Sequence, residues 1–206
     1  LAIFGLSDSA KSWRTKALTL SKLIRHRGPD WNGIYCGENC ILAHERLAIV
    51  GLISGAQPIT NKMGNIHLSI NAEIYNYKQL TKDLIKRNPI YEGQFTTDTD
   101  CEILIHLYKE YGPDFLTKIE INGMFAFALY DSINDIYIIA RDPVGIIPLY
   151  RGWGKDGSIW FSSEMKAIQE TCDNFELFPP GHYYIGHSIN DSTNGEMKQF
   201  YNKLYI

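Results

Sequence analysis

The sequence lacks the features that mark several large classes of protein. It has no run of Lys or Arg, and its 20 basic residues are balanced by 23 acidic ones, which gives a formal net charge of −3. This balance gives no sign of a nucleic-acid-binding surface. No apolar stretch approaches the ~20 residues of a membrane-spanning helix, and no basic-then-apolar signal segment opens the sequence. We therefore expect neither a nucleic acid nor a membrane as a partner.

Cysteine is also scarce, with four residues in 206. Cys36 and Cys40 are spaced like half of a metal site, but no second Cys/His pair with matching spacing follows them. Cys101 and Cys172 lie among apolar residues, which predicts small side chains packed in the core. None of the four has a neighbouring His or cation in the sequence that would activate it as a nucleophile. We expect a reduced, cytoplasmic protein without structural disulfides.

The order of apolar patterns predicts a single domain of the α+β class over residues 1–206. With 45% hydrophobic residues, the chain can bury a large core. The patterns predict strands at 1–6, 33–36, 40–50 and 66–71 and helices at 11–27 and 77–87. Residues 95–111 are predicted to begin with a capping run and continue as a helix, and mostly strands follow from 123 onward, with a short helix at 163–170. The regular strand–helix alternation of a parallel sheet is absent, which favours α+β. Strands that are apolar on both faces, such as GMFAFALYD (123–131), predict two stacked sheets covered by helices.

The stretch IHLSINAEIYNY (66–77) begins with strand-like alternation and ends in polar residues. At the end of that strand, the Asn71 side-chain amide would lie beside the main-chain N–H of Ala72. Two such donors on a rigid strand end could hold a developing oxyanion. An Asx turn between a strand and a helix would explain the same residues without any catalytic role.

Charged residues inside apolar or capping segments also have two interpretations. Glu45 and Arg46 stand within ILAHERLAIV (41–50), where a charge is costly to bury unless it is paired. Either the two point in opposite directions, one to solvent and one to a salt bridge, or Arg46 lines a pocket and binds a carboxylate. Asp100 either complements the dipole of a helix that begins there or meets an ammonium group. The spacing leaves these alternatives open.

A series of motifs, taken in order, carries a resemblance to a known family: RHRGPDW (25–31), LAHERLAIV (42–50), GAQPI (55–59), NAEIYNY (71–77), TDTDCE (97–102), GMFAFALYD (123–131), ARDPVGIIPLY (140–150), SSEMKAI (162–168) and FPPGH (178–182). In these motifs the chain resembles the class II glutamine amidotransferases, and among them the glutamine-hydrolysing half of the asparagine synthetases. SSEMKAI and ARDPVGIIPLY favour this branch over the hexosamine-phosphate, purine-pathway and glutamate synthase relatives.

The resemblance implies an N-terminal nucleophile hydrolase fold, which is a four-layer αββα sandwich of two antiparallel sheets. It implies that an N-terminal cysteine thiolate attacks the side-chain amide of glutamine and forms a thioester that water then hydrolyses. The free α-amino group, with an unperturbed pKa of about 8, would act as the general base. By match to the family, Asn71 and the Ala72 N–H would form the oxyanion hole.

The same resemblance assigns the substrate-binding residues. Arg46 would bind the α-carboxylate of glutamine, and Glu73 and Asp100 would surround its α-ammonium group. The adjoining wall of the site would be formed by Leu47, Ile49 and Val50. No metal or other cofactor is implied for this half of the enzyme. ATP and Mg²⁺ are expected only in the synthetase domain, and no Ser-Gly-Gly phosphate-loop motif is present in this sequence.

Two departures from the family pattern matter. The family places Cys-Gly-Ile directly ahead of the residue that matches Leu1, so the nucleophile is expected just before Leu1 and no numbered residue carries that role. The family also has Gly where Ala72 stands. If that position needs a glycine conformation, Ala would cost about 1 kcal/mol and displace the donor slightly. These departures motivate an alternative, a catalytically degenerate domain retained for glutamine binding or for assembly.

The expected partners follow from the leading interpretation. They are glutamine as substrate, a covalently linked synthetase domain that uses the ammonia to convert aspartate to asparagine, and a possible second copy in a homodimer.

Overall fold

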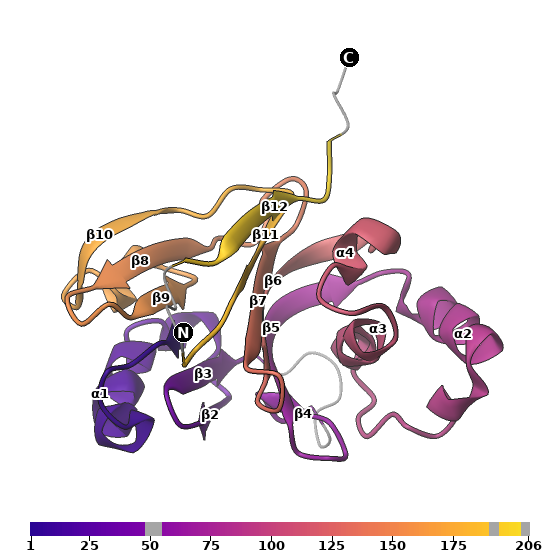
Figure 1. The fold of residues 1–206 in the computed structure, drawn as a ribbon, viewed down its shortest axis with the longest axis horizontal. Coiled ribbons are helices and arrows are strands. Elements are labelled where there is room, and N and C mark those ends of the chain that lie inside the picture. Colours follow the sequence, from indigo (N-terminus) through magenta and orange to yellow (C-terminus); the bar gives the residue numbers. More distant parts are fainter. Residues whose placement is uncertain (48–54, 190–193, 203–206) are drawn as a thin grey trace.

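Two stacked antiparallel sheets form the centre of the molecule, and helices cover both outer faces (Figure 1). The structure is a computed structural model that describes residues 1–47, 55–189 and 194–202. Helix α1 lies on one side of the sandwich, and helices α2, α3 and α4 lie on the other (Figure 1). The predicted αββα arrangement is therefore confirmed.

The first sheet has six strands in the order β10-β8-β9-β1-β3-β2. Its strands are β1 (Ala2–Phe4), β2 (Trp31–Cys36), β3 (Cys40–Arg46), β8 (Tyr150–Gly154), β9 (Ile159–Ser162) and β10 (Cys172–Leu177). Helix α1 (Ala10–Lys22) packs on its outer face, where Leu20 joins Ile3, Ile41 and Trp160 in one apolar core. The Ser9 side chain caps the start of this helix by accepting a hydrogen bond from the Lys11 N–H.

The second sheet also has six strands, in the order β12-β11-β7-β6-β5-β4. Its strands are β4 (Ile59–Thr60), β5 (Ile66–Ile74), β6 (Gly123–Asp131), β7 (Ile136–Arg141), β11 (His182–Gly186) and β12 (Glu196–Gln199). The helices on its outer face are α2 (Tyr77–Arg87), α3 (Ile103–Tyr111) and α4 (Phe115–Lys118). Every pairing within the described part of both sheets is antiparallel.

Strand β6 is apolar on both faces because it has a core on each side. Phe125, Phe127 and Leu129 belong to the core beneath the helices, whereas Ala126 and Ala128 face the other sheet. This confirms the prediction that the strand is covered on both sides. The small alanines leave space between the two sheets, and that space adjoins the candidate site.

The segment predicted as one helix at 11–27 is divided in two. Helix α1 ends at Lys22, and Arg25–Arg27 form a separate 3-10 turn. The cations of this turn pair with carboxylates from elsewhere in the fold. Arg25 lies 3.6 Å from Glu45, and the side chains of His26 and Arg27 both contact Glu164. These ion pairs anchor the turn over the end of the first sheet.

Other boundaries also differ from the sequence prediction. The strand predicted at 40–50 ends at Arg46, and residues 48–50 lie outside the described residues. Residues 163–170 form only a 3-10 turn, Met165–Ala167, in place of a helix. Strand β10 was not expected, because it lies at the edge of its sheet with most side chains exposed and shows no alternation. Across 1–47, 55–189 and 194–202, no helix combines the length and apolar character needed to cross a bilayer.

Candidate active site

A cavity of about 130 Å³ lies between the two sheets, where β1 begins. Its wall includes Leu1, Ala43 and His44 from the first sheet and Asn71 and Ala72 from the second. A volume of this order holds several water molecules. Leu1 and the start of β1 are therefore part of the cavity wall.

The backbone of Leu1 is fixed in this position by pairing with β3. The Leu1 nitrogen donates to the Ala43 carbonyl at 2.8 Å, and the Ala43 N–H donates to the Leu1 carbonyl at 2.8 Å. Leu1 is only 9% exposed and belongs to the core beneath α1. Because both bonds continue the β1–β3 ladder, any residue ahead of Leu1 starts from a defined point in the wall.

A second cavity, of about 110 Å³, adjoins the first. The two cavities share four lining residues: Leu47, Gln57, Ala72 and Cys101. The second cavity also gathers the charged residues of the predicted substrate site, Arg46, Glu73 and Asp100. The structure thus brings the predicted donor pair and the predicted charged residues into two connected spaces. Ile49 and Val50, the rest of the predicted wall, lie outside the described residues.

The side chains of Glu45 and Arg46 occupy different environments, as neighbours on a strand do. The Glu45 carboxylate accepts a hydrogen bond from Ser21 Oγ at 2.9 Å and lies 3.6 Å from the Arg25 guanidinium. Arg46 is 8% exposed and lines the second cavity together with two carboxylates. Of the two interpretations of this pair, the structure therefore supports a salt bridge for Glu45 and a pocket position for Arg46.

The hydrogen-bonding pattern of β5 determines the direction of each main-chain N–H. Strand β5 pairs with β6 without a register shift. Just beyond the two ends of this pairing, Ser132 N–H donates to the Asn65 carbonyl at 2.9 Å and Tyr75 N–H donates to the Asn122 carbonyl at 2.8 Å. Backbone bonds to one neighbour alternate along an antiparallel strand, so odd-numbered residues of β5 bond to β6. The N–H of Ala72, an even-numbered residue, points away from β6.

On that outer edge of β5, two side chains occupy the positions on either side of Ala72. Ile70 N–H donates to Gln57 Oε1 at 2.8 Å, and Ile74 N–H donates to Asp100 Oδ2 at 2.6 Å. The N–H of Ala72 lies between them and has no acceptor within the described part of the chain. A main-chain donor left unpaired in a partly enclosed position is unusual. It is available to an oxygen atom in the adjoining cavities.

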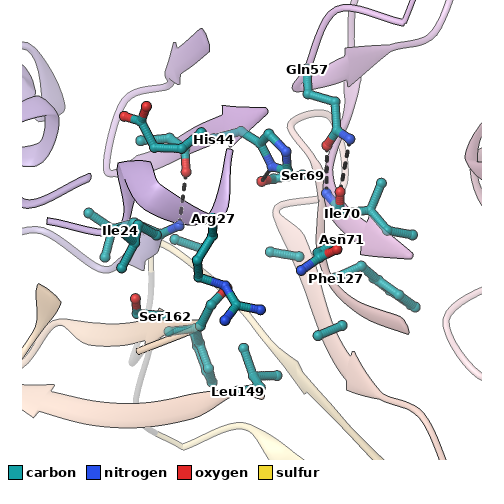
Figure 2. A pocket seen from close by; sticks show the side chains of 18 of the residues that line it. Ile24, Arg27, His44, Gln57, Ser69, Ile70, Asn71, Phe127, Leu149 and Ser162 are labelled. Atoms are coloured by element: carbon teal, nitrogen blue, oxygen red, sulfur yellow. Dashed lines mark hydrogen bonds between the residues drawn. The ribbon is translucent and has the colours of Figure 1, made fainter. Parts of the chain in front are cut away.

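Asn71 supplies a second donor at the same place. Its amide makes no hydrogen bond to any other residue that the structure describes. Figure 2 shows the Asn71 side chain directed into the cavity beside Ile70 and Gln57. The side-chain amide and the neighbouring main-chain N–H therefore face the cavity region from the same strand end.

The backbone of Ala72 does not have the strain that its replacement of a glycine suggested. Within the described ranges, Asp135 is the one non-glycine residue with a positive φ. Ala72 stands in regular β5 structure opposite Phe125. The strain on which the expected displacement of the donor depended is therefore absent, because an extended conformation accommodates Ala as readily as Gly.

Sequence reasoning did not identify His44 or Ser69, which lie side by side in the wall of the first cavity (Figure 2). His44 Nδ1 lies 3.1 Å from Ser69 Oγ. Burial lowers the pKa of His44 to about 3, and the positive charge of Arg46 acts in the same direction. The ring is neutral at physiological pH. The two residues come from different sheets, so no local spacing in the sequence connects them.

The four cysteines are all present as thiols at neutral pH. Burial raises the pKa of Cys40 to about 12 and that of Cys172 to about 11, and it also raises the pKa of Cys36. Burial and the adjacent Asp100 carboxylate raise the pKa of Cys101 well above its usual value. Cys101 lines both cavities but donates to Asp100 at 3.5 Å, so it is not poised as a thiolate nucleophile.

Comparisons with known proteins agree with this geometry. The chain matches the glutamine amidotransferase domain family over residues 1–188. It is 52% identical over 206 residues to a probable glutamine-hydrolysing asparagine synthetase of Dictyostelium discoideum, covering 100% of this chain and 35% of that protein. It is 46% identical over 202 residues to asparagine synthetase 3 of Arabidopsis thaliana, covering 98% of this chain and 32% of that protein.

Among solved structures, the fold is similar to that of the glutamine phosphoribosylpyrophosphate amidotransferase of B. subtilis. The TM-score is 0.74 at 21% sequence identity, over 98% of this chain and 49% of that chain. This similarity confirms the predicted N-terminal nucleophile hydrolase fold. The chain belongs to the glutamine amidotransferase domain family. Its curated relatives are glutamine-hydrolysing asparagine synthetases, and the chain spans about a third of their length.

Proposed function

We propose that this chain is the glutaminase domain of an asparagine synthetase and hydrolyses glutamine to glutamate and ammonia. The observation that carries the proposal is the pair of unoccupied donors, the Asn71 amide and the Ala72 N–H, at the cavity where the chain begins. Acyl transfer from an amide passes through a tetrahedral oxyanion, which such preorganised donors stabilise. A structural Asx turn would use the Asn71 side chain within the fold.

In this proposal the nucleophile is a cysteine that stands ahead of Leu1 in the full protein. The family motif puts it three residues before Leu1, within about 10 Å at ~3.3–3.6 Å per extended residue. The thiol proton would pass to the free α-amino group, and the sulfur would bond to the amide carbon of glutamine and generate the oxyanion. Collapse of that intermediate, with a proton delivered from the α-amino group, would release ammonia and leave a thioester. Water would then release glutamate and restore the thiol.

The second cavity provides the groups that would bind the amino-acid end of the substrate. The Arg46 guanidinium is suited to the α-carboxylate because its planar fork matches two oxygens. Glu73 and Asp100 would bind the α-ammonium group, and Leu47 with Ile49 and Val50 would form the adjoining wall. One carboxylate oxygen of Asp100 accepts the Ile74 N–H, so the other would meet the substrate.

The ammonia would be used outside this domain. The curated relatives are about three times as long as the chain, and we propose that a linked synthetase domain converts aspartate to asparagine with ATP and Mg²⁺. The glutaminase step itself would need no metal or other cofactor. A degenerate, binding-only domain is the less favoured alternative, because Ala72 keeps both an ordinary backbone and a free donor.

The test uses the full-length protein and compares it with a variant in which the N-terminal cysteine is replaced by alanine. Glutamate and ammonia released from glutamine are measured, together with asparagine made from added ammonia. We expect the replacement to abolish glutamine hydrolysis and to leave ammonia-dependent synthesis intact. Hydrolysis that continues at the parental rate without the cysteine would contradict the proposal, as would a parental protein that releases no glutamate.

A further inference from the structure

Strand β4 is unusually short, and its pairing with β5 stops just before the candidate oxyanion hole. Its two residues pair as Ile59 with Leu68 and Thr60 with His67. Continuing this register would place residue 57 opposite Ile70 and residue 55 opposite Ala72. An extended chain along that line would have used the Ala72 N–H as an ordinary ladder donor.

The main chain leaves that line at Gln57, and the Gln57 side chain takes its place. Gln57 Oε1 accepts from the Ile70 N–H at 2.8 Å, and Gln57 Nε2 donates to the Ile70 carbonyl at 2.8 Å. Figure 2 shows these two bonds side by side. One side-chain amide thus reproduces the pair of bonds that a strand backbone would make. Unlike a strand, it ends there and offers nothing to Ala72.

The Gln57 backbone is held away from β5 by contact with the other sheet. It packs against Gly33 on β2, where an added Cβ would collide with the Gln57 carbonyl oxygen. Gly33 therefore permits an approach that a larger residue would prevent. Gln57 spans both sheets, with its backbone on one and its amide on the other, and it lines both cavities.

We propose that Gln57 is a positioning residue for the oxyanion hole, holding the edge of β5 at Ile70 while leaving the Ala72 N–H unpaired for the substrate. The inference rests on the proposed glutaminase function and assigns Gln57 no contact with the reacting atoms. Asp100 holds the other side through Ile74, so Ala72 is fixed between two side-chain anchors. A donor fixed in advance needs no reorganisation as the oxyanion forms.

The role predicts a particular kinetic signature. Loss of the anchor would let the Asn71–Ala72 segment move, which weakens donors needed only in the transition state. The value of kcat should then fall while glutamine binding is retained. A side chain that merely supported the fold would lower activity through the amount of folded protein and would not separate kcat from KM.

The experiment compares Gln57→Ala and Gln57→Glu with the parent in the full-length protein. Glutamate is nearly isosteric with glutamine and can still accept from the Ile70 N–H, but its second oxygen opposes the Ile70 carbonyl. Gln79→Ala is the matched control, because this exposed glutamine on α2 bonds only to Asp83 among the described residues. Ammonia-dependent asparagine synthesis reports the integrity of each protein.

We expect both Gln57 variants to lose about tenfold or more in kcat for glutamine hydrolysis, with KM within about twofold of the parent. The control should match the parent in both constants. Residue-resolved hydrogen exchange should show that the Ile70 amide loses protection in Gln57→Ala. The double variant Gln57→Ala/Asn71→Ala should lose less in kcat than the product of the two single losses, because both residues act on the same oxyanion hole.

Three outcomes would overturn the role of Gln57: parental kcat in Gln57→Glu, a loss confined to KM, or an Ile70 amide that stays protected in Gln57→Ala. A failure of the proposed function is distinguishable, since the parental protein itself would then release no glutamate. If Gln57→Ala does not fold, Gln57→Glu alone decides the matter, and its ammonia-dependent synthesis shows whether it is intact.

Discussion

Asp100 and Ile74 are joined by a hydrogen bond in which the Ile74 N–H donates to Asp100 Oδ2 at 2.6 Å. This bond ties a carboxylate of the second cavity to the strand that carries Asn71 and Ala72. The proposed substrate contact of Asp100 and the proposed oxyanion hole therefore share one strand edge. At Ile70 and Ile74, side chains accept the main-chain hydrogen bonds of this edge in place of a neighbouring strand.

The double role of Asp100 can be separated by two substitutions. Asp100→Asn keeps an oxygen that can accept the Ile74 N–H but removes the charge that would bind the ammonium group. We expect Asp100→Asn to weaken glutamine binding by about 1.5–3 kcal/mol, the range for a hydrogen bond to a charged group, with little loss of stability. Asp100→Ala should in addition lower the unfolding midpoint. Calorimetric titration with glutamine and denaturant unfolding measure the two effects.

The control for this pair is Asp83→Asn on exposed α2, which should leave both binding and stability at parental values. Parental glutamine affinity in Asp100→Asn would show that its charge does not meet the substrate.

Arg46→Ala tests the proposed carboxylate contact. Loss of a buried charged partner should lower kcat/KM for glutamine by a factor that corresponds to at least about 2 kcal/mol of transition-state stabilisation. Arg87→Ala is the matched control, because Arg87 pairs with Glu110 on the exposed surface, remote from both cavities. Steady-state kinetics of glutamate release measure the effect. A reduction of less than about threefold, which is under 1 kcal/mol, would remove Arg46 from the substrate site.

Ala72→Gly tests whether the alanine perturbs the site. Because Ala72 has an ordinary extended backbone, glycine should relieve no strain there. We expect glutamine hydrolysis within about twofold of the parent and a loss of roughly 0.5–1 kcal/mol in the free energy of unfolding. Glutamate release and denaturant unfolding give the two quantities. A large gain in kcat would mean that the parental donor is misplaced.

Two neutral histidines predict how stability changes with pH. Burial lowers the pKa of His44 to about 3 and that of His67 to about 4, whereas an unfolded histidine titrates near pH ~6.5. Below that pH the unfolded chain takes up protons that the folded chain excludes, so the free energy of unfolding falls as the pH decreases from about 6.5 towards about 4. Denaturant midpoints at several pH values measure this decrease.

His67→Phe should flatten the acid dependence, since it keeps an aromatic ring against Tyr35 but cannot take up a proton. The two rings stack with centroids 3.6 Å apart. Gln79→Ala, which changes no titrating group at an exposed position of α2, should leave the pH dependence unchanged. An equally steep decrease in His67→Phe would show that His67 is not among the groups responsible.

Glu102 stays ionised well into the acid range and continues to stabilise the segment 96–100 that leads to Asp100. Burial alone would raise the pKa of Glu102, but the His106 ring 3.5 Å away and hydrogen bonds from Thr97 and Thr96 outweigh it and lower the pKa to about 2. Its stabilising contribution is therefore present above the unfolded pKa of about 4.3 and is lost as the pH falls through about 2. The loss of stability between pH ~6.5 and ~4.3 belongs to the histidines and not to this carboxylate.

Local patterns predicted those parts of the fold that depend on neighbouring residues. The alternation in 66–70 predicted β5, and the two-sided apolar pattern of 123–131 predicted a strand between two cores. Strand β10 was missed because an exposed edge strand needs no alternation. The end of α1 at Lys22 was missed because the following cations pair with distant carboxylates.

The sequence also predicted part of the site, namely those residues that stand in recognisable motifs. Resemblance to the family identified Asn71, Ala72, Arg46 and Asp100, and the structure places them around two adjoining cavities. The resemblance could not reveal that the Gln57 side chain takes the place of a strand beside β5. That role depends on where the main chain turns away from the direction in which β4 would continue.

The most direct test of the account is the kcat of Asn71→Ala for glutamine hydrolysis in the full-length protein, with ammonia-dependent asparagine synthesis as the internal reference. Removal of one oxyanion donor should lower kcat by about 10²–10³ while KM stays near the parental value. A kcat within about threefold of the parent, in a protein whose ammonia-dependent activity is intact, would contradict the assignment of this strand end as the oxyanion hole.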